Sequence, residues 1–158
     1  MGDLEGKNPL KKNPWKSDLV AAGFSLLVGV AYVWGVSDDP LVITPLLDLA
    51  HYQAMAESMV DGTFAAPFFV DPLYVLLRAL VLGLFGASFM APIAINLLAM
   101  MLAAVALRRL GTRLISAPAG LLASLLLPLC RPLLFYQALA MKETLALALF
   151  LWALRFFV

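Results

Sequence analysis

The stretch LVAAGFSLLVGVAYVWGV (Leu19–Val36) contains eighteen consecutive residues without a charged side chain. At 1.5 Å per residue, a helix of this length reaches about 27 Å, close to the thickness of the hydrocarbon core of a bilayer. A secretory signal peptide is the competing interpretation, but its apolar region usually has about 7–15 residues and ends in small residues. This run instead ends in Tyr-Val-Trp-Gly-Val and continues into Ser-Asp-Asp-Pro. It therefore predicts an uncleaved first membrane span.

The composition of the whole chain agrees with a membrane protein. Of the 158 residues, 63% are hydrophobic and 13% are charged, whereas about 25% of the residues of a soluble domain are charged. The mean hydropathy of +0.95 excludes disordered and fibrous proteins, and the single cysteine, Cys130, excludes an intrachain disulfide. The net charge of +1, with no stripe of basic residues, gives no sign of a nucleic-acid partner.

The remaining apolar runs complete a predicted all-α integral membrane fold with about four transmembrane helices. The polar residues 1–18 are predicted to form a cytoplasmic tail, and residues 19–158 form one membrane module. A helix is predicted over Leu46–Val60, ending at Asp61-Gly62. Leu73–Phe85 is apolar, but its thirteen residues and Arg78 favour a helix at the membrane interface over a span. The predicted spans lie at about 19–36, 89–107, 114–130 and 144–158.

The positions of Lys and Arg determine the predicted orientation. With a cytoplasmic N-terminus and an interfacial 73–85 segment, eight of the eleven basic residues fall on the cytoplasmic side, as the positive-inside rule requires. A crossing at 73–85 would move Arg108, Arg109 and Arg113 to the outside. The long first loop, residues 37–88 with its two juxtamembrane helices, is therefore predicted to be external.

Asp48, His51 and Tyr52 are the first candidates for chemistry, because spacings of three and four place them on one face of the 46–60 helix. A carboxylate at the rim of a membrane cavity can act as a general base toward a hydroxyl. An amphipathic surface helix whose Asp and His face water explains the same pattern. His51 is the only histidine, so Asp48 and His51 would supply at most two ligands of a metal site completed elsewhere.

Three basic residues, Arg78, Arg131 and Lys142, fall on the predicted outer side. An anionic partner such as a lipid-linked phosphate accounts for them, and snorkelling to lipid headgroups accounts equally well for Arg78. Lys142 and Glu143 interrupt an apolar run, and burying either charge at the bilayer centre costs about 2.5–3.5 kcal/mol. The pair is therefore predicted to mark the outer end of the fourth span, facing a cavity.

A longer pattern joins these features. The strings LLDLAHYQAMAESMVDG (46–62), APFFVDPLY (66–74) and LFGAS (84–88), followed by RRLGTR (108–113) and Lys142-Glu143, resemble the N-terminal part of GT-C class membrane glycosyltransferases. These are the relatives of protein mannosyltransferases and bacterial aminoarabinose transferases. In that family an acidic residue precedes a Tyr by four positions in the first external loop, and a Pro-Leu-Tyr-like element opens a second juxtamembrane helix. The resemblance covers about residues 19–158.

The resemblance implies transfer of a sugar from a polyprenyl-phosphate donor to an acceptor on the outer face of the membrane. By motif position, Asp48 would be the general base and Glu143 the second acidic residue of the site. Many members have another acidic residue directly after the first, where this chain has Leu49. No metal ligand is therefore assigned, and a divalent metal ion is the only candidate cofactor. The substrate-binding residues would be His51, Tyr52, Asp71 and Tyr74, together with Arg131 and Lys142, whose placement suits neutralisation of the leaving phosphate.

The expected partners are a polyprenyl-phosphate-linked sugar and membrane lipids. Because family members usually have many more spans, the chain is also expected to be an N-terminal module with little activity alone, partnered by the remainder of a split or truncated transferase. The alternative function is a non-catalytic small membrane protein that packs against a partner membrane protein. Small and polar residues within the spans, such as Gly23, Gly29 and Asn96, motivate that alternative.

Overall fold

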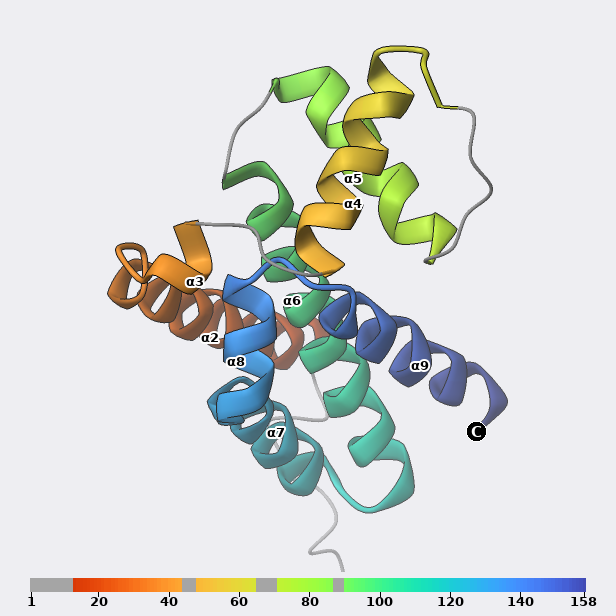
Figure 1. Ribbon diagram of the computed structural model, residues 1–158. Helices are drawn as coiled ribbons and strands as arrows, with labels where there is room; N and C mark the ends of the chain where they lie inside the picture. The colour runs from red at the N-terminus through yellow and green to blue at the C-terminus, as the bar shows by residue number, and fades with distance from the viewer. Residues whose placement is uncertain (1–12, 44–47, 65–70, 87–89) are drawn as a thin grey trace, which may run out of the picture.

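The computed structural model describes residues 13–43, 48–64, 71–86 and 90–158, and the elements in these ranges are all helical. Figure 1 shows their arrangement. In chain order the helices are α2 (Pro14–Gly35), α3 (Pro40–Ile43), α4 (Asp48–Val60), α5 (Pro72–Phe85), α6 (Met90–Leu114), α7 (Ala117–Leu126), the 3₁₀ turn η1 (Leu127–Leu129), α8 (Arg131–Ala138) and α9 (Glu143–Phe157). The predicted all-α class is confirmed for this part of the chain.

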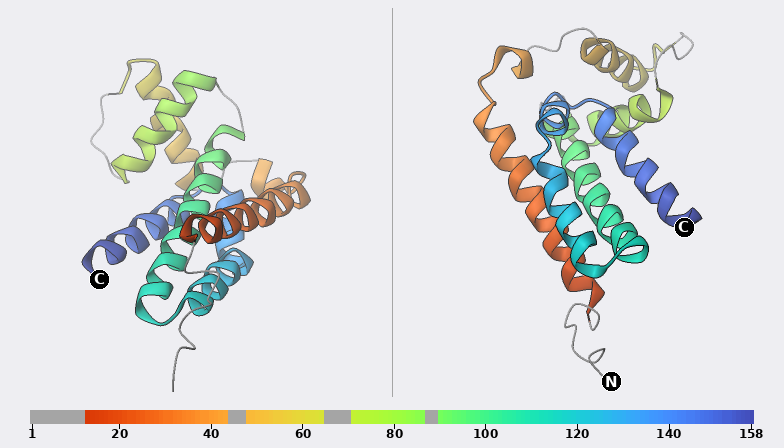
Figure 2. Two further views of the ribbon diagram at one scale, coloured as in Figure 1. Left: turned by 180° about the vertical axis from the view of Figure 1, so that it is seen from behind. Right: turned by 90° about the horizontal axis from the view of Figure 1, so that it is seen from below.

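The helix α6 is the centre of the bundle. It packs against α2, α7 and α9, and Figure 2 shows these neighbours around it from two further directions. Small side chains let α9 approach closely, because Ala99, Ala103 and Ala106 of α6 are buried against Ala148 and Leu151. The helices α4 and α5 pack on each other and form a separate layer at the N-terminal end of α6 (Figure 1).

The contact between α6 and α7 depends on glycine. A Cβ atom on Gly120 would lie 2.4 Å from the carbonyl oxygen of Arg108 and 2.5 Å from the backbone nitrogen of Thr112. A Cβ atom on Gly111 would lie 2.7 Å from the Cα atom of Gly120. Only hydrogen fits at these two positions, so the backbones of α6 and α7 touch where the chain reverses direction.

Two helices of the described chain, α2 and the Pro92–Leu114 part of α6, are long and apolar enough to cross a membrane. The pair formed by Ala117–Leu129 and α8 qualifies only as one broken span, because it bends by 55°. The fourth predicted span corresponds to α9, which has fifteen residues. Two of the four predicted spans therefore have the length and composition of straight crossings.

The element boundaries differ from the sequence-based expectation at three places. The helix α2 begins at Pro14 rather than after residue 18, because proline is favoured in the first helical turn. The helix α6 continues to Leu114, so Arg108, Arg109 and Arg113 belong to a helix and not to a loop. The predicted straight span at 114–130 is instead α7 and η1, followed at Cys130 by the bend into α8. Pro118, Pro128 and Pro132 each stand at the start of a helical segment there.

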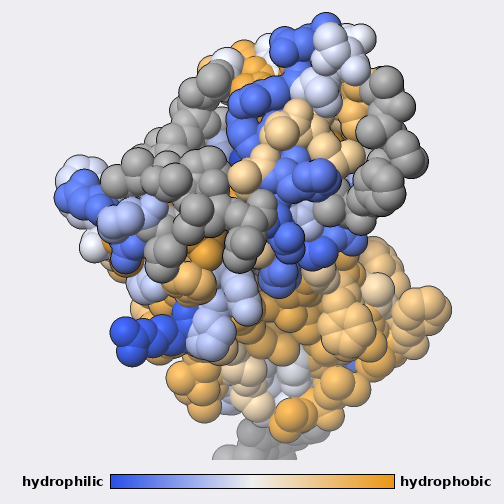
Figure 3. Space-filling view, in the orientation of Figure 1, coloured by the Kyte–Doolittle hydropathy of each residue, from blue (hydrophilic) through white to orange (hydrophobic). Residues whose placement is uncertain are grey.

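Helices are present at both places where the sequence predicts them in the first loop, and both end where predicted, although the expected start of the first, Leu46, lies outside the described residues. The helix α4 ends at Val60, directly before Asp61 and Gly62, where Gly62 has a positive φ of 70°. The helix α5 begins at Pro72 and ends before Gly86, whose φ is 72°. Figure 3 shows hydrophilic residues gathered over the α4 end of the molecule and a largely hydrophobic surface over the helices below it. This division matches helices in contact with lipid below a layer in contact with water.

Candidate functional site

Three residues from distant parts of the sequence meet where the α4–α5 layer contacts the bundle. The Lys142 ammonium group, in the turn before α9, forms an ion pair with Asp71 Oδ2, directly before α5. The hydroxyl of Tyr52, on α4, lies 3.5 Å from the same Asp71 oxygen, and the Lys142 nitrogen lies 5.9 Å from the centre of the Tyr52 ring. The structure therefore brings together three of the residues that the sequence predicts to bind substrate.

Both charges of this pair are favoured by the contact and both remain accessible to solvent. The hydrogen bond from Lys142 holds the pKa of Asp71 below its usual value of 3.8, and the hydrogen bonds to Asp71 and Tyr52 raise the pKa of Lys142 above its usual value of 10.5. The Asp71 side chain is 54% exposed and that of Lys142 is 37% exposed. An approaching ligand can therefore reach both groups while both are charged.

Tyr74 and Asn96 support the turn that carries Lys142. The hydroxyl of Tyr74, on α5, donates a hydrogen bond to the backbone carbonyl of Ala140 and lies 3.5 Å from Asn96 Oδ1. The Asn96 amide donates to the carbonyl of Met141 at 2.7 Å. Both side chains are buried, and burial raises the pKa of Tyr74 to about 12, so that its hydroxyl keeps its proton at neutral pH. Tyr74 thus supports the turn. The sequence predicts that it binds substrate, but its buried side chain is not open to a ligand.

Arg78 faces the interior and does not reach lipid headgroups. It is 5% exposed, and its guanidinium donates to Gln53 Oε1 at 2.6 Å and to the Ala140 carbonyl at 3.3 Å. The Arg78 carbon Cζ lies 5.9 Å from the centre of the Tyr74 ring. The snorkelling interpretation of Arg78 is therefore wrong, and the residue instead joins α4, α5 and the turn before α9.

Glu143, the predicted second acidic residue, begins α9 next to Lys142. Its atom Oε2 is buried and has no hydrogen-bond partner among the described residues. A buried carboxylate oxygen without a donor is costly, so Glu143 is a group that a bound ligand could satisfy.

Asp48 and His51 lie in the first turn of α4 and are both exposed. Helical geometry places Asp48 one turn before Tyr52, on the same side of α4. Neither side chain makes a hydrogen bond or ion pair with another residue in the described ranges. The Asp48 carboxylate is thus exposed, one helical turn from Tyr52.

Arg131 is separate from the cluster. It is exposed at the start of α8, and the eight residues of this helix correspond to a length of about 12 Å. Asn96, Gln53 and Arg78 hold the elements around the cluster. Of these three, the sequence predicts only Arg78 on the same outer side; Asn96 is expected only as a polar residue within a span, and Gln53 has no sequence signal. The Pro67–Val70 part of the predicted motif lies outside the described residues.

The part of the chain that the structure describes does not supply enough side-chain ligands for a metal site. No group of three or more His, Cys, Asp or Glu side chains lies close enough there to hold a metal ion. Comparison of the chain with family models, curated proteins and solved structures finds no match. The interpretation of the site therefore depends on its own geometry and on the sequence pattern.

Proposed function

We propose that the chain is a multi-pass membrane glycosyltransferase module, which transfers a sugar from a polyprenyl-phosphate donor to an acceptor on the outer face of the membrane. One observation carries the proposal. Tyr52, Asp71 and Lys142 come from separate segments of the sequence, and their side chains meet at one place, next to Glu143. A shared binding role explains why three residues that are far apart in a chain of 158 residues lie together, whereas a random distribution would not bring them together.

The proposed topology has four crossings, formed by α2, α6, the bent pair α7–α8, and α9, with the N-terminus in the cytoplasm and residues 37–88 outside. On this topology Arg131, at the bend before α8, lies partway along the third crossing and not at its outer end, where the sequence predicts it. The arrangement of the layers supports it. The helices α4 and α5 and the turn before α9 share one end of the bundle (Figure 1). Arg108, Arg109 and Arg155 lie together at the opposite end. A group of arginines at the end away from the α4–α5 layer agrees with the proposed cytoplasmic position of that end, because the positive-inside rule concerns Lys and Arg.

Lys142 is proposed to bind the donor phosphate. In the free structure its charge is engaged by Asp71, but ion pairs between exposed side chains contribute only about 0–1 kcal/mol. Hydrogen bonds to a charged group contribute about 1.5–3 kcal/mol each, so a phosphate can displace Asp71 from Lys142 at little cost. Arg131 is not assigned to the phosphate because α8 separates it from this site.

The proposed reaction follows from the remaining groups. Asp48 accepts the proton of the acceptor hydroxyl, the acceptor oxygen bonds to C1 of the sugar, and the bond between C1 and the donor phosphate oxygen breaks. The phosphate leaves with its lipid, and Lys142 compensates the negative charge that develops on it. Glu143, whose buried oxygen has no donor among the described residues, accepts a hydrogen bond from a sugar hydroxyl. None of these proposed steps uses a metal ion.

A photoreactive farnesyl phosphate tests the donor site in micelles. We expect it to label the segments around Tyr52 and Lys142, and we expect Lys142→Gln to weaken its binding about tenfold because one charge-assisted hydrogen bond is lost. The matched control is Arg113→Gln, which removes the same charge from an exposed position in the last turn of α6. Labelling that is unchanged in Lys142→Gln would contradict the proposed site.

Transfer of labelled sugar tests the catalytic roles. Asp48→Asn keeps the size of the side chain and removes the base, so turnover should fall about 100-fold or more, while binding of the lipid phosphate should persist. A variant with the turnover of the unmodified protein would show that Asp48 is not the base. The experiment uses the chain together with any further membrane segment required for activity.

A non-catalytic partner-binding protein is the second candidate, and the packing of the small and polar residues bears on it. Asn96 is fully buried and bonded within the chain, and a Cβ atom on Gly29 would meet Gln137 and Leu97. Only Gly23 of the three residues faces open space. A stable complex with another membrane protein that does not change on Asp48→Asn would favour this candidate.

A further inference from the structure

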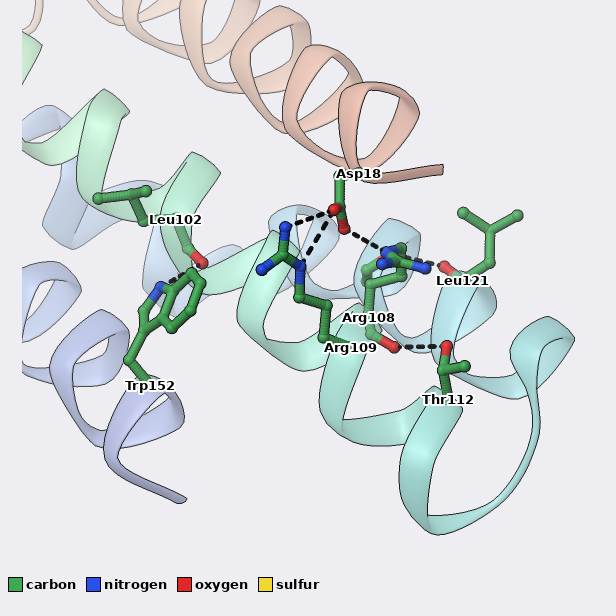
Figure 4. Close-up of polar contacts among 8 residues, drawn as sticks. Asp18, Leu102, Arg108, Arg109, Thr112, Leu121 and Trp152 are labelled. Carbon is green, nitrogen blue, oxygen red and sulfur yellow. Dashed lines mark hydrogen bonds and ion pairs between the residues drawn. The ribbon is translucent and has the colours of Figure 1, made fainter. Parts of the chain in front are cut away.

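A second polar cluster lies at the end of the bundle opposite to Lys142. Asp18, in the second turn of α2, accepts a hydrogen bond of 2.5 Å from Arg108 Nε and bonds of 3.0 and 2.7 Å from Arg109 Nε and Nη2 (Figure 4). The Arg108 and Asp18 side chains are 8% and 13% exposed, whereas that of Arg109 is 37% exposed. One carboxylate thus holds two guanidinium groups in place, the second of them reaching solvent.

These residues border an open cavity of about 480 Å³ between α2, α6, α7 and α9. Its lining includes three arginines, Arg108, Arg109 and Arg155, against one acidic residue, Asp18. Among the described residues, the lining therefore has a surplus of two positive charges. The first turn of α2 and the first residue of α7 also border the cavity, and the N-terminal ends of helices carry partial positive charge.

Aromatic side chains hold the third arginine. The guanidinium carbon of Arg155 lies 5.0 Å from the centre of the Trp152 ring, and that of Arg109 lies 5.6 Å from the same ring. Trp152 is itself oriented by a hydrogen bond of 3.1 Å from its indole nitrogen to the Leu102 carbonyl (Figure 4). Arg155 makes no ion pair within the described part of the chain. Its charge is therefore held in place by the aromatic ring and is not paired with a carboxylate of the described ranges.

We propose that this cavity binds a phosphate ester, with the headgroup of an anionic phospholipid as its source. A guanidinium group binds two oxygens of one phosphate with two parallel hydrogen bonds. The surplus of two positive charges in the described lining can neutralise the negative charge of a phosphate group. The volume is in the range of cavities that hold small ligands, about 300–1,000 Å³. The site is independent of the cluster around Lys142 and of the reaction proposed there.

The surroundings of the cavity favour a lipid over a soluble phosphate ester. Trp15, which lines the cavity, is exposed, and so are the apolar side chains of Leu19, Leu114 and Phe156 at the same end of the helices. A headgroup bound among the arginines would leave its acyl chains next to this apolar surface. On the proposed topology, the cavity faces the leaflet that contains most of the anionic lipid.

Lipid titration of the full chain in a neutral detergent, followed by native mass spectrometry, tests the proposal. Phosphatidylglycerol should bind about tenfold or more tightly than phosphatidylcholine, whose headgroup has no net charge. Arg155→Gln should weaken phosphatidylglycerol binding about tenfold, because a charge-assisted contact is removed, and Arg155→Lys, which keeps the charge, should weaken it less. Arg113→Gln, an exposed position outside the cavity lining, should leave binding unchanged within about twofold.

A parallel titration with soluble glycerol phosphate separates the two sources of the phosphate group. Binding of phosphatidylglycerol alone identifies a lipid site, and equal binding of glycerol phosphate identifies a soluble phosphate ester. The proposal is overturned if neither binds, or if Arg113→Gln and Arg155→Gln weaken binding equally, since diffuse surface charge would then explain the result. Should Arg155→Gln unfold, as judged by its Tm without lipid, Arg109→Gln replaces it with the same expected outcome.

Discussion

Asn96 of α6 is bonded to the backbone of Met141, 45 residues later in the chain, by a hydrogen bond of 2.7 Å from the side-chain amide to the carbonyl oxygen. The same amide nitrogen lies 3.4 Å from the carbonyl oxygen of Tyr136. The fully buried Asn96 thus joins the first half of α6 to both ends of the turn that precedes Lys142. A side chain of α6 therefore helps to set the position of the turn that carries Lys142.

Replacement of Asn96 by Ala should therefore destabilise the protein. The Met141 carbonyl would lose its partner in a buried environment, which costs about 1–3 kcal/mol. We expect a lower Tm in micelles and weaker binding at Lys142, because the turn is no longer held in place. Leu98→Ala is the control, since Leu98 is on the same helix and exposed. Equal effects of the two variants on binding would show that Asn96 does not position the site.

The ion pair between Asp71 and Lys142 should give a small contribution to stability with a defined pH range. The pKa of Asp71 is lowered by Lys142, so its contribution is present above the usual value of 3.8 and is lost as the pH falls through the lower folded-state pKa. The pKa of Lys142 is raised by Asp71, so its contribution is present below 10.5 and is lost as the pH rises through the higher folded-state pKa.

Asp71→Asn tests this range. Between about pH 5 and about pH 9 the variant should be less stable than the unmodified protein by at most about 1 kcal/mol, because both side chains are more than one-third exposed and water screens the pair. The difference should disappear in acid. A Tm series over pH measures it, and a difference that grows below pH 3.8 would contradict the sign of the shift.

The glycines of the helices should differ sharply in their tolerance of alanine. Gly120→Ala places a Cβ atom within 2.6 Å of backbone and side-chain atoms of α6, so α7 must move away, and overpacking of this kind costs about 1–3 kcal/mol. Gly23→Ala meets nothing within 4 Å and should stabilise α2 by about 0.5–1 kcal/mol. The two Tm values should shift in opposite directions. Two shifts of the same sign would contradict the close approach of α6 and α7.

The sequence was most informative where one local signal dominates. The uncharged run at 19–36 predicted the body of α2, and Pro72 and Gly62 predicted where α5 begins and α4 ends. The predicted third span ends at Cys130, where the structure has its bend, but the helix α8 that follows the bend was not predicted, because hydropathy is the same whether a segment continues straight or turns. Hydropathy reports burial from water and contains no information on helix direction.

The site was predictable in its residue types but not in its contacts. Helical spacing placed Asp48 and Tyr52 on one side of α4, whereas the partners of Lys142 depend on how the α4–α5 layer sits on the bundle. No local signal predicts that Arg78 points inward, because the same apolar segment with one arginine is compatible with snorkelling and with burial. Asp18 belongs to the segment 1–18 that is predicted to form a tail. An acidic residue that stands next to a membrane span in a lysine-rich segment nevertheless indicates a basic partner, which the structure shows to be Arg108.

Asp18 gives the last prediction, because its two partners differ in burial. Removing one member of a buried pair leaves the other charge uncompensated and costs about 3–5 kcal/mol, whereas an exposed pair contributes about 0–1 kcal/mol. Asp18→Asn should therefore reduce the free energy of unfolding by about 3 kcal/mol, since Arg108 remains buried, at 8% exposure. Arg109→Gln should reduce it by less than about 1 kcal/mol, because Arg109 is 37% exposed. Denaturant titration in micelles measures both, and equal losses would show that the burial of Arg108 does not determine the strength of the cluster.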